Sequence, residues 1–431
     1  MIVLYNIVFF CAVILGSPYL LWKIIRYKRY RQGFLERLGY PAPEKLNRCK
    51  GKDVLWIHAV SVGEANAIYS FYLHFKERHP KTIVVFSTTT RTGQNWITPR
   101  LKPEDLAIYY PIDFLWSVWR LLSLIRPKAF VSIETEIWPN FWWAAHRQNV
   151  KLGILNGRLS KRSFRGYQKV LWFMQPLLQK LSWIQVQTPE DAERFLELGA
   201  AEDKVQVGGN LKFDVVFNSN DLHQEVQTLK EMLHFTSESI LMGGSTHAGE
   251  EAILLSVFDL LKEKFLNLRL VLAPRHPERC EEVQRLIEKM GYVCRLHSEK
   301  ASKVWGQAEI YLIDQMGVLP GFYALSTLVF MGKSLTASGG QNLLEPAMLG
   351  KVVLFGPNMD NFKQIATSFL EEEAAIEVQD RRELLQVVQK YLLSGALRKN
   401  IGDKAKQMVE KNKGALNLAL QKIEHEVQWR I

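Results

Sequence analysis

Short apolar runs alternate with helix-length segments from residue 51 onward. The runs are rich in β-branched and aromatic residues and are bounded by polar or turn residues, as is typical of buried strands. In the first half we predict strands at Val54–Ile57, Thr82–Phe86, Ala107–Tyr110, Ala129–Ile133, Lys151–Leu155, Trp183–Val186 and Lys204–Val207. Helical patterns lie between them, for example at Ala65–Arg78, Leu115–Ile125, Tyr167–Leu181 and Pro189–Leu198. This alternation predicts a parallel sheet with crossover helices.

The alternation restarts after the polar stretch Phe217–Leu222, which has the composition of a linker. Further strands are predicted at Ser239–Met242, Arg269–Ala273, Tyr292–Leu296, Glu309–Ile313, Thr327–Met331 and Val352–Phe355. The two halves share this rhythm without a sequence repeat. We therefore expect an α/β fold of two Rossmann-like domains, residues 51–217 and 218–395, facing one another across a cleft. The charged, helical segment 396–431 could pack back on the first domain.

The first 22 residues form a separate, apolar segment. Ile2–Trp22 contains no charged residue and is about long enough to cross a membrane as a helix. Basic residues follow the apolar run, whereas a secretory signal carries its positive charge before it. We expect a membrane anchor at 1–22, a basic juxtamembrane segment at 23–50, and the remainder of the chain in the cytoplasm. Pro18 leaves open whether the anchor spans the membrane or lies in its interface.

The net charge of +11 changes the list of possible partners. It indicates an anionic partner, which could be nucleic acid, anionic lipid or a phosphorylated substrate. The four cysteines are scattered without metal-ligand spacing, which suits a reducing compartment. His58, His247 and His276 lack a second ligand at fixed spacing, so we assign no metal and no cofactor.

Glu64 is the candidate general base. It follows the strand Val54–Ile57 and a small-residue turn through Ser61 and Gly63, and it stands at the start of a helical pattern. Ligands of open α/β sheets bind at such strand ends. Ser61 and Glu64 also have the spacing of a capping box, in which the carboxylate only accepts a backbone N–H. The spacing alone does not choose between catalysis and capping.

Polar residues follow other strands of the first half. Glu134 and Glu136 come after Ala129–Ile133, and Asn156 and Arg158 come after Lys151–Leu155, so these side chains are expected at one edge of the sheet. Arg158, Arg162, Arg165 and Lys169 recur at helical spacing. They indicate either a surface for lipid phosphates or a merely solvated helix face.

The second half offers three polar segments at predicted strand ends. Gly243–His247 is expected to be a strand–helix turn that could approach an anion. Arg275, in Pro274–Pro277, could grip a phosphate. In Ser338–Pro346, Pro346 must lie in or before a first helical turn. Glu345 could accept hydrogen bonds from two ribose hydroxyls, and Asn342 could cap the helix.

Taken together, these motifs resemble the Kdo (3-deoxy-D-manno-octulosonic acid) transferases of lipopolysaccharide assembly. Seven collinear segments carry the resemblance over nearly the whole chain: SVGE (61–64), ETEIWPN (134–140), NGRLSKRS (156–163), GNLKFD (209–214), GGSTHAGEE (243–251), PRHPER (274–279) and NLLEPAMLG (342–350). The sequence departs from the usual pattern at Val318, where many members have glutamate, and at Gln341, where many have histidine.

The resemblance implies a GT-B glycosyltransferase that moves Kdo from CMP-Kdo to a lipid A precursor on the cytoplasmic face of the inner membrane, with no nucleic-acid partner. It implies Glu64 as base, with Glu134 and Lys212 assisting the transition state. The helix amino terminus is expected to keep Glu64 ionised at neutral pH. The residues implied to bind CMP are Pro274, Arg275, Met316, Gly317, Val318, Asn342, Leu343, Leu344 and Glu345.

Two alternatives stay open at this point. One is another GT-B enzyme that uses a UDP-sugar, such as a transferase or a non-hydrolysing epimerase. The other is a membrane-tethered nucleotide-binding protein without catalysis, in which Glu64 only caps its helix.

Overall fold

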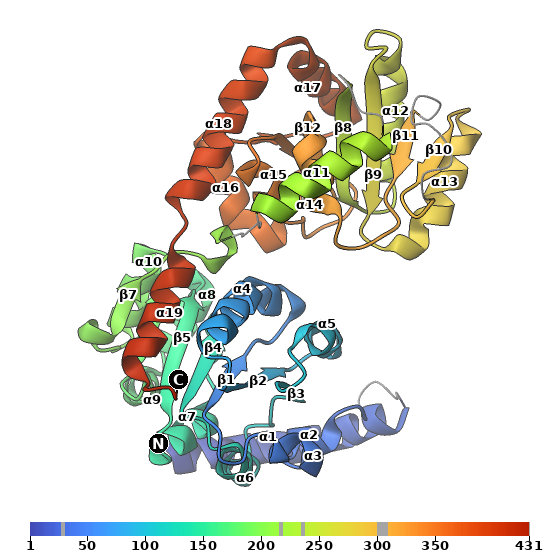
Figure 1. Ribbon diagram of the computed structural model, residues 1–431. Coiled ribbons are helices and arrows are strands. Elements are labelled where there is room, and N and C mark those ends of the chain that lie inside the picture. The colour runs from blue at the N-terminus through green and yellow to red at the C-terminus, as the bar shows by residue number, and fades with distance from the viewer. Residues whose placement is uncertain (27–30, 215–218, 234–237, 300–308, 431) are drawn as a thin grey trace. The chain divides into compact units, whose positions relative to one another are not determined.

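The computed structural model of the protein describes residues 1–26, 31–214, 219–233, 238–299 and 309–430 (Figure 1). The chain divides into two compact units. Unit 1 comprises Met1–Asp214 and Asn412–Ile431, and unit 2 comprises Val215–Lys411. Each unit is built around one seven-stranded sheet whose paired strands are all parallel.

The sheet of unit 1 has the strand order β3-β2-β1-β4-β5-β6-β7. Its strands are β1 (Val54–His58), β2 (Ile83–Thr88), β3 (Leu106–Tyr109), β4 (Ala129–Ile133), β5 (Lys151–Gly157), β6 (Trp183–Val186) and β7 (Val205–Val207). Strands β2 and β3 follow β1 on one side of the sheet, and β5, β6 and β7 follow β4 on the other. The order therefore reverses between β1 and β4, which is the switch point where Rossmann-like sheets bind ligands.

Both faces of this sheet are covered, which explains why its strands are continuous apolar runs. Side chains alternate between the faces, so Val54 and Trp56 enter one core cluster while Leu55 and Ile57 enter the other. The helices of unit 1 are α1 (Ile2–Arg26), α2 (Phe34–Arg37), α3 (Pro43–Asn47), α4 (Val62–Arg78), α5 (Arg91–Ile97), α6 (Leu115–Ile125), α7 (Pro139–Arg147), α8 (Lys161–Gln168), α9 (Leu171–Leu178), α10 (Pro189–Glu197) and α19 (Ala415–Glu426).

The sheet of unit 2 has the order β10-β11-β9-β8-β12-β13-β14, which reverses between β8 and β12. Its strands are β8 (Ser239–Thr246), β9 (Leu268–Pro274), β10 (Cys294–Leu296), β11 (Ile310–Leu312), β12 (Leu328–Met331), β13 (Val352–Phe355) and β14 (Ile376–Glu377). Its helices are α11 (Ser219–Leu233), α12 (Glu250–Lys262), α13 (Cys280–Lys289), α14 (Leu319–Leu325), α15 (Leu344–Met348), α16 (Lys363–Glu371), α17 (Arg381–Leu393) and α18 (Gly395–Lys411).

The prediction of an α/β fold with two Rossmann-like domains is confirmed, while four local predictions are wrong. The pattern Tyr167–Leu181 is not one helix, because α8 ends at Gln168 and α9 begins at Leu171. Gly243–Thr246 is not a turn, because β8 continues to Thr246. A Cβ at Gly243 or Gly244 would meet Leu254 or Tyr323, so the glycines serve close packing within the strand. Pro274 is the last residue of β9 rather than the first residue after it. Ser219–Leu222 belongs to α11 instead of a linker, and residues 217–218 lie outside the described residues.

The C-terminal segment is helical, as predicted, and is shared between the units. Helix α18 packs on α15 and β13 of unit 2. Helix α19 joins the core of unit 1, where Leu416, Leu420 and Ile423 pack in the same cluster as Phe71 and Phe75 of α4 (Figure 1). The carboxylate of Asp214 accepts the backbone N–H groups of Gly414 (2.8 Å) and Leu416 (2.9 Å) and thereby caps α19.

Candidate active site

Glu64 and Glu134 lie at the switch point of the sheet in unit 1. Glu64 is in the first turn of α4, which follows β1, and Glu134 directly follows β4. Because β1 and β4 are paired and parallel, their carboxyl ends meet at the same edge. Two carboxylates predicted from separate motifs thus come together where a ligand of this fold binds.

The capping box at Glu64 is formed and leaves acceptor capacity on the carboxylate. Ser61 Oγ accepts the Glu64 N–H at 3.4 Å and donates to Glu64 Oε1 at 3.1 Å. The Val60 N–H donates to Glu64 Oε2 at 2.7 Å. An ionised carboxylate has about four acceptor positions, so these two donors do not fill it. Capping and catalysis are therefore compatible roles for the same side chain.

The pKa of the Glu64 carboxyl differs from the expectation drawn from the helix terminus. Burial raises this pKa to about 6, against the lowering effect of the Val60 N–H, and the charge of Glu134 raises it further. The Ser61 hydroxyl and Lys212 act in the opposite direction. The helix amino terminus therefore does not dominate, although the carboxyl is still mainly ionised at neutral pH. A pKa just below the working pH suits a general base.

Glu134 adopts a backbone conformation that non-glycine residues seldom take, with φ of 56°. Its N–H donates to the Leu155 carbonyl at 3.0 Å, which fixes the turn after β4 against β5. The next residue, Thr135, donates its hydroxyl to the Arg158 carbonyl and accepts the Arg158 N–H. The loops that carry Glu134 and Arg158 are therefore tied together.

Glu136 is a third carboxyl in this cluster, and the candidate site residues did not include it. Its pKa is raised to about 7, first by burial and then by the charges of Glu64 and Glu134. The sequence placed Glu136 at this sheet edge beside Glu134 but gave no sign of the burial that raises its pKa.

Lys212 joins the carboxylates from a 3₁₀ turn, Leu211–Phe213. Asn156 Oδ1 accepts the Leu211 N–H at 3.0 Å, and Asn210 Oδ1 accepts the Lys212 N–H at 3.0 Å. Burial lowers the pKa of Lys212, while the charge of Glu134 raises it. The charge of Glu64 also raises the pKa of Lys212, and the charge of Arg158 lowers it. The three predicted catalytic residues Glu64, Glu134 and Lys212 thus form one electrostatic cluster.

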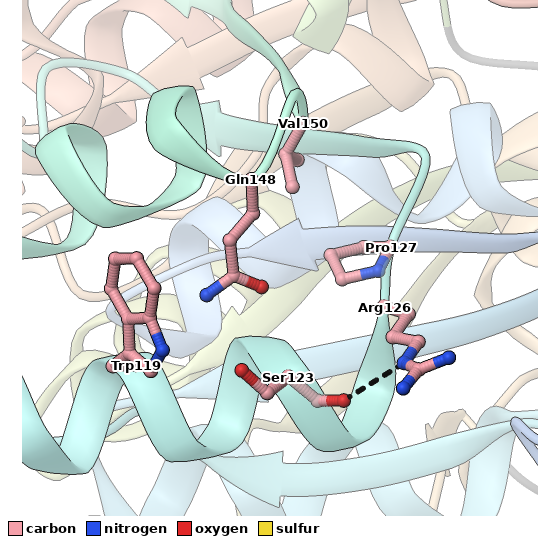
Figure 2. Close-up of a pocket in the computed structure, with 6 residues that line it drawn as sticks. All are labelled: Trp119, Ser123, Arg126, Pro127, Gln148 and Val150. Atoms are coloured by element: carbon pink, nitrogen blue, oxygen red, sulfur yellow. Dashed lines mark hydrogen bonds between the residues drawn. The ribbon is translucent and has the colours of Figure 1, made fainter.

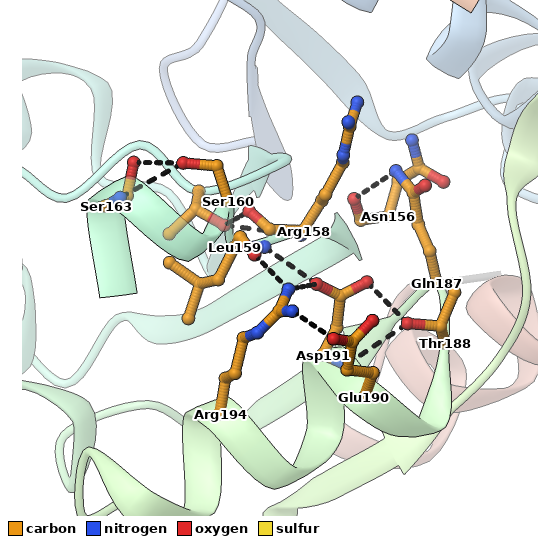
Figure 3. A network of polar contacts seen from close by, with 11 residues as sticks. Asn156, Arg158, Leu159, Ser160, Ser163, Gln187, Thr188, Glu190, Asp191 and Arg194 are labelled. Atoms are coloured by element: carbon orange, nitrogen blue, oxygen red, sulfur yellow. Dashed lines mark hydrogen bonds and ion pairs between the residues drawn. The ribbon is translucent and has the colours of Figure 1, made fainter. Parts of the chain in front are cut away.

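Figure 3 shows how the loop after β5 is fixed below Arg158. Asp191 Oδ1 accepts the Leu159 N–H at 2.9 Å, and Arg194 donates to the Leu159 carbonyl. The Arg158 side chain extends away from Asp191 and Arg194 and is exposed (Figure 3). Arg162 and Arg165 are exposed on α8. All three remain able to contact an anionic ligand.

In unit 2 the predicted nucleotide residues follow strands that share one sheet edge. Arg275 follows β9, residues 316–318 follow β11, and residues 342–345 lie beyond β12. Strands β8, β9, β11 and β12 are consecutive neighbours in the sheet. Asn342 Oδ1 accepts the Leu344 N–H at 3.2 Å, and Asn342 Nδ2 donates to Glu345 at 3.2 Å. Pro346 lies in the first turn of α15, as predicted.

Comparison with known proteins identifies the family. The family model for 3-deoxy-D-manno-octulosonic-acid transferase (kdotransferase) matches residues 32–215. The 3-deoxy-D-manno-octulosonic acid transferase of Haemophilus influenzae is 31% identical over 92% of this chain and 92% of its own length. The Rickettsia felis enzyme of the same name is 31% identical over 86% of this chain and 79% of its own.

The chain belongs to the Kdo transferase family. It is therefore a glycosyltransferase that transfers Kdo, as its motifs predicted. Among solved structures, the UDP-GlcNAc 2-epimerase of Neisseria meningitidis superposes with a TM-score of 0.56 at 13% identity, covering 86% of this chain and all (100%) of that one. That likeness confirms the GT-B type of fold and, at this identity, nothing beyond the fold.

Figure 2 shows a pocket of about 410 Å³ whose lining contains none of the carboxylate-cluster residues. Its lining includes Arg126 and Pro127, two to three residues before β4, and Val150, directly before β5. The pocket is therefore at the amino ends of these strands, whereas Glu64 and Glu134 are at the carboxyl ends. In parallel sheets the amino edge is not where ligands bind, so we assign it no part in transfer.

Histidine serves packing in the first sheet of the Kdo transferase. His58 is fully buried, stacks on Tyr110 with ring centroids 3.8 Å apart, and has a pKa lowered to about 3 by burial. Among the described residues, no three His, Cys, Asp or Glu side chains are grouped so as to hold a metal ion.

Proposed function

We propose that this Kdo transferase moves Kdo from CMP-Kdo to a lipid A precursor with inversion at the anomeric carbon, with Glu64 as the general base. The observation that carries the proposal is the cluster of Glu64, Glu134 and Lys212 at the switch point of unit 1. A hydroxyl is a poor nucleophile until its proton is removed as the new bond forms. Glu64 has free acceptor capacity and a pKa near 6, which fit that task.

The proposed reaction is a single displacement. Glu64 accepts the proton of the acceptor hydroxyl while its oxygen attacks the anomeric carbon of Kdo. The bond from that carbon to the CMP phosphate breaks, and its electron pair leaves with CMP. Attack from the face opposite the leaving group inverts the configuration. Glu134 and Lys212 assist the transition state, and Lys212 offsets negative charge that develops on the leaving phosphate.

We propose that CMP binds at the carboxyl edge of the sheet in unit 2. Arg275 would pair with the phosphate, and Glu345 would accept the two ribose hydroxyls. Pro274, residues 316–318 and residues 342–344 would complete the site. Burial raises the pKa of Glu345 and the Asn342 side chain lowers it, so a ribose hydroxyl would add a donor that stabilises the ionised carboxylate. Val318 and Gln341 stand where many members have glutamate and histidine, so the contacts at these two positions would differ from theirs.

The acceptor side of the proposal rests on the N-terminal helix and the exposed arginines. Ile2–Tyr19 of α1 has a mean hydropathy of 1.9, and no residue in it is fully buried in the structure. We propose that α1 holds the enzyme at the cytoplasmic face of the inner membrane, where lipopolysaccharide assembly begins. Arg158, Arg162 and Arg165 would then contact the phosphates of the lipid acceptor.

Incubation with CMP-Kdo and a tetraacylated lipid A precursor, followed by mass spectrometry of the lipid, tests donor, acceptor and product together. The proposal expects one or more Kdo masses added to the lipid and stoichiometric release of CMP. Transfer from a UDP-sugar in a parallel incubation, with none from CMP-Kdo, would refute it. CMP binding without any turnover would favour a binding protein instead.

A further inference from the structure

Helix α1 contacts the rest of unit 1 along one face. Its partly buried residues recur at helical spacing, at Ile2, Tyr5, Asn6, Phe9 and Val13. Tyr5 packs at a tilt against Phe173 with ring centroids 5.8 Å apart, and Phe9 packs edge-on against Phe114 at 5.4 Å. The first half of the helix therefore lies along the rest of unit 1 (Figure 1).

Two polar contacts hold the first turns of α1, one to Asp113 before α6 and one to Asn140 at the start of α7. The Tyr5 hydroxyl donates to Asp113 Oδ2 at 2.9 Å. Asn6 and Asn140 exchange two side-chain hydrogen bonds, each 2.8 Å long. Asp113 also accepts the backbone N–H groups of Asn140 (3.0 Å) and Phe141 (2.9 Å). We call Tyr5–Asp113 and Asn6–Asn140 the α1 latch.

The outer surface of α1 is apolar and has no partner among the described residues. Val3, Ile7, Val8, Phe10 and Leu15 are each more than half exposed. Two exposed tryptophans flank the helix: Trp116 stacks with Phe114 at 5.9 Å and is 50% exposed, and Trp172 contacts Phe173 at 5.8 Å and is 58% exposed. Tryptophan at this position beside an apolar surface is typical of the membrane–water interface.

A spanning helix is incompatible with the latch. The cations Lys23 and Arg26 close α1 and would mark the cytoplasmic side of a spanning helix. Asn6 precedes Lys23 by 17 residues, which is about 26 Å along a helix and nearly the whole hydrocarbon core. In that arrangement Asn6 would lie at the opposite side of the membrane from Asn140. The Asn6–Asn140 pair can exist only if α1 lies along the membrane surface.

We infer that α1 is an in-plane helix, seated in the interfacial layer of an anionic bilayer by its outer face and by Trp116 and Trp172, and joined to the body of the enzyme by the α1 latch. This inference rests on the membrane attachment proposed above and adds its geometry. Docking buries the polar residues Tyr5 and Asn6 against protein, so only apolar side chains of these turns face lipid.

The α1 latch also lies close in sequence to the carboxylate cluster. Helix α7, which contains Asn140, begins at Pro139, and Glu134 lies five residues before it. Asn140 is fully buried, and its side chain also donates to the Asp113 carbonyl at 2.6 Å. The contact that seats α1 therefore also fixes the end of the Glu134–Trp138 loop. Tyr5 and Asn6 are in this sense positioning residues for the carboxylate cluster.

Cross-linking in native membranes tests the inference on the full-length enzyme. In a background with Cys11, Cys49, Cys280 and Cys294 replaced by serine, Asn6→Cys is combined with Asn140→Cys and treated with a short bifunctional thiol reagent. Because Asn140 is buried, Tyr5→Cys with Phe173→Cys provides a second pair. The matched control is Ile7→Cys with Asn140→Cys, since Ile7 is adjacent in sequence and 56% exposed.

We expect efficient cross-linking in both test pairs, at least tenfold less in the Ile7 control, and Kdo transfer by the linked enzyme. Absence of a link in both test pairs, in membranes where the unlinked variants still transfer measurable Kdo, would overturn the in-plane geometry and leave the proposed function intact. Loss of transfer by the parent enzyme would count against the proposed function and not against the geometry.

Kinetics separate the positioning role from simple attachment. Asn6→Leu keeps an apolar helix but removes the amide pair, so we expect kcat to fall at least threefold with KM for CMP-Kdo and the membrane-bound fraction unchanged. Asn6→Asp, which still accepts from Asn140 Nδ2, should recover part of that loss. An unchanged kcat in Asn6→Leu would overturn the positioning role.

Discussion

Glu64 and Glu250 occupy similar places in the two sheets, yet their surroundings differ. Each lies in the first turn of the helix that follows the strand at a switch point, α4 after β1 and α12 after β8. Glu250 is fully buried and accepts four backbone N–H groups, those of His247 and Lys333 (2.8 Å each), Ser334 (2.9 Å) and Leu335 (3.0 Å). Glu64 accepts one backbone N–H and one hydroxyl.

This difference separates a structural carboxylate from one available for chemistry. The four donors fill the acceptor positions of Glu250 and bind the loop after β12 to the loop after β8. Glu64 keeps unfilled positions and is crowded by Glu134, so its charge is less well compensated. A carboxylate at a strand end is therefore not necessarily a base. Whether it can accept a proton from substrate depends on how many hydrogen-bond donors already occupy its oxygens.

Glu64→Gln should have the largest effect on activity. A glutamine keeps the size and the cap but cannot take the proton, so we expect kcat for Kdo transfer to fall about 10²–10⁴-fold. Because burial and Glu134 disfavour the ionised form, removing the charge should not lower the melting temperature at pH 8. Retained turnover, measured by release of CMP, would refute the role.

Glu250→Gln should have the opposite profile. The new NH₂ group faces two backbone donors that lose their acceptor, at a cost on the order of 4 kcal/mol. We expect a clear fall in melting temperature and in the denaturant midpoint, with transfer by the remaining folded enzyme close to normal. A variant as stable as the parent would contradict the structural role assigned to Glu250.

The sequence predicts the framework of both sheets because buried parallel strands are continuous apolar runs. β4, β6 and β13 have the predicted bounds. The prediction fails at Gly243–Thr246, since glycines that serve close packing have the same composition as a turn. The bonds of Glu250 also could not be predicted, because Lys333, Ser334 and Leu335 are more than 80 residues away.

The site is predictable in its main residues and less so in its energetics. Glu64, Glu134 and Lys212 follow from strand ends and family motifs. The raised pKa of Glu64 depends on burial that only the folded chain provides. Left-handed backbone at Glu134, Asn156, Ser245 and Lys333, each at or just after a strand end, is likewise imposed by tertiary contacts.

Glu134→Gln tests, through the pH dependence of the rate, whether the charge of Glu134 affects Glu64. The charge of Glu134 helps raise the pKa of Glu64, so its removal should lower that pKa below 6. We expect the acidic limb of kcat/KM for the residual activity to move to lower pH than in the parent. An unmoved limb would show that the two carboxylates are not coupled.

The smallest expected effect comes from the exposed arginines of α8. Arg162→Ala combined with Arg165→Ala should raise KM for the lipid acceptor roughly threefold to tenfold, with kcat and KM for CMP-Kdo unchanged. The effect should shrink at high salt, because exposed charges are screened. Lys399→Ala with Lys411→Ala, on α18, removes the same charge and should change neither parameter.

The pH profile of kcat/KM for the parent enzyme tests the central claim most directly. An ionised Glu64 is required, so the rate should rise with pH, with a slope of one, through an apparent pKa of about 6, and then level off. The residual rate of Glu64→Gln should lack this limb. A parent profile that is flat between pH 5 and pH 7, or the same limb in Glu64→Gln, would contradict Glu64 as the base.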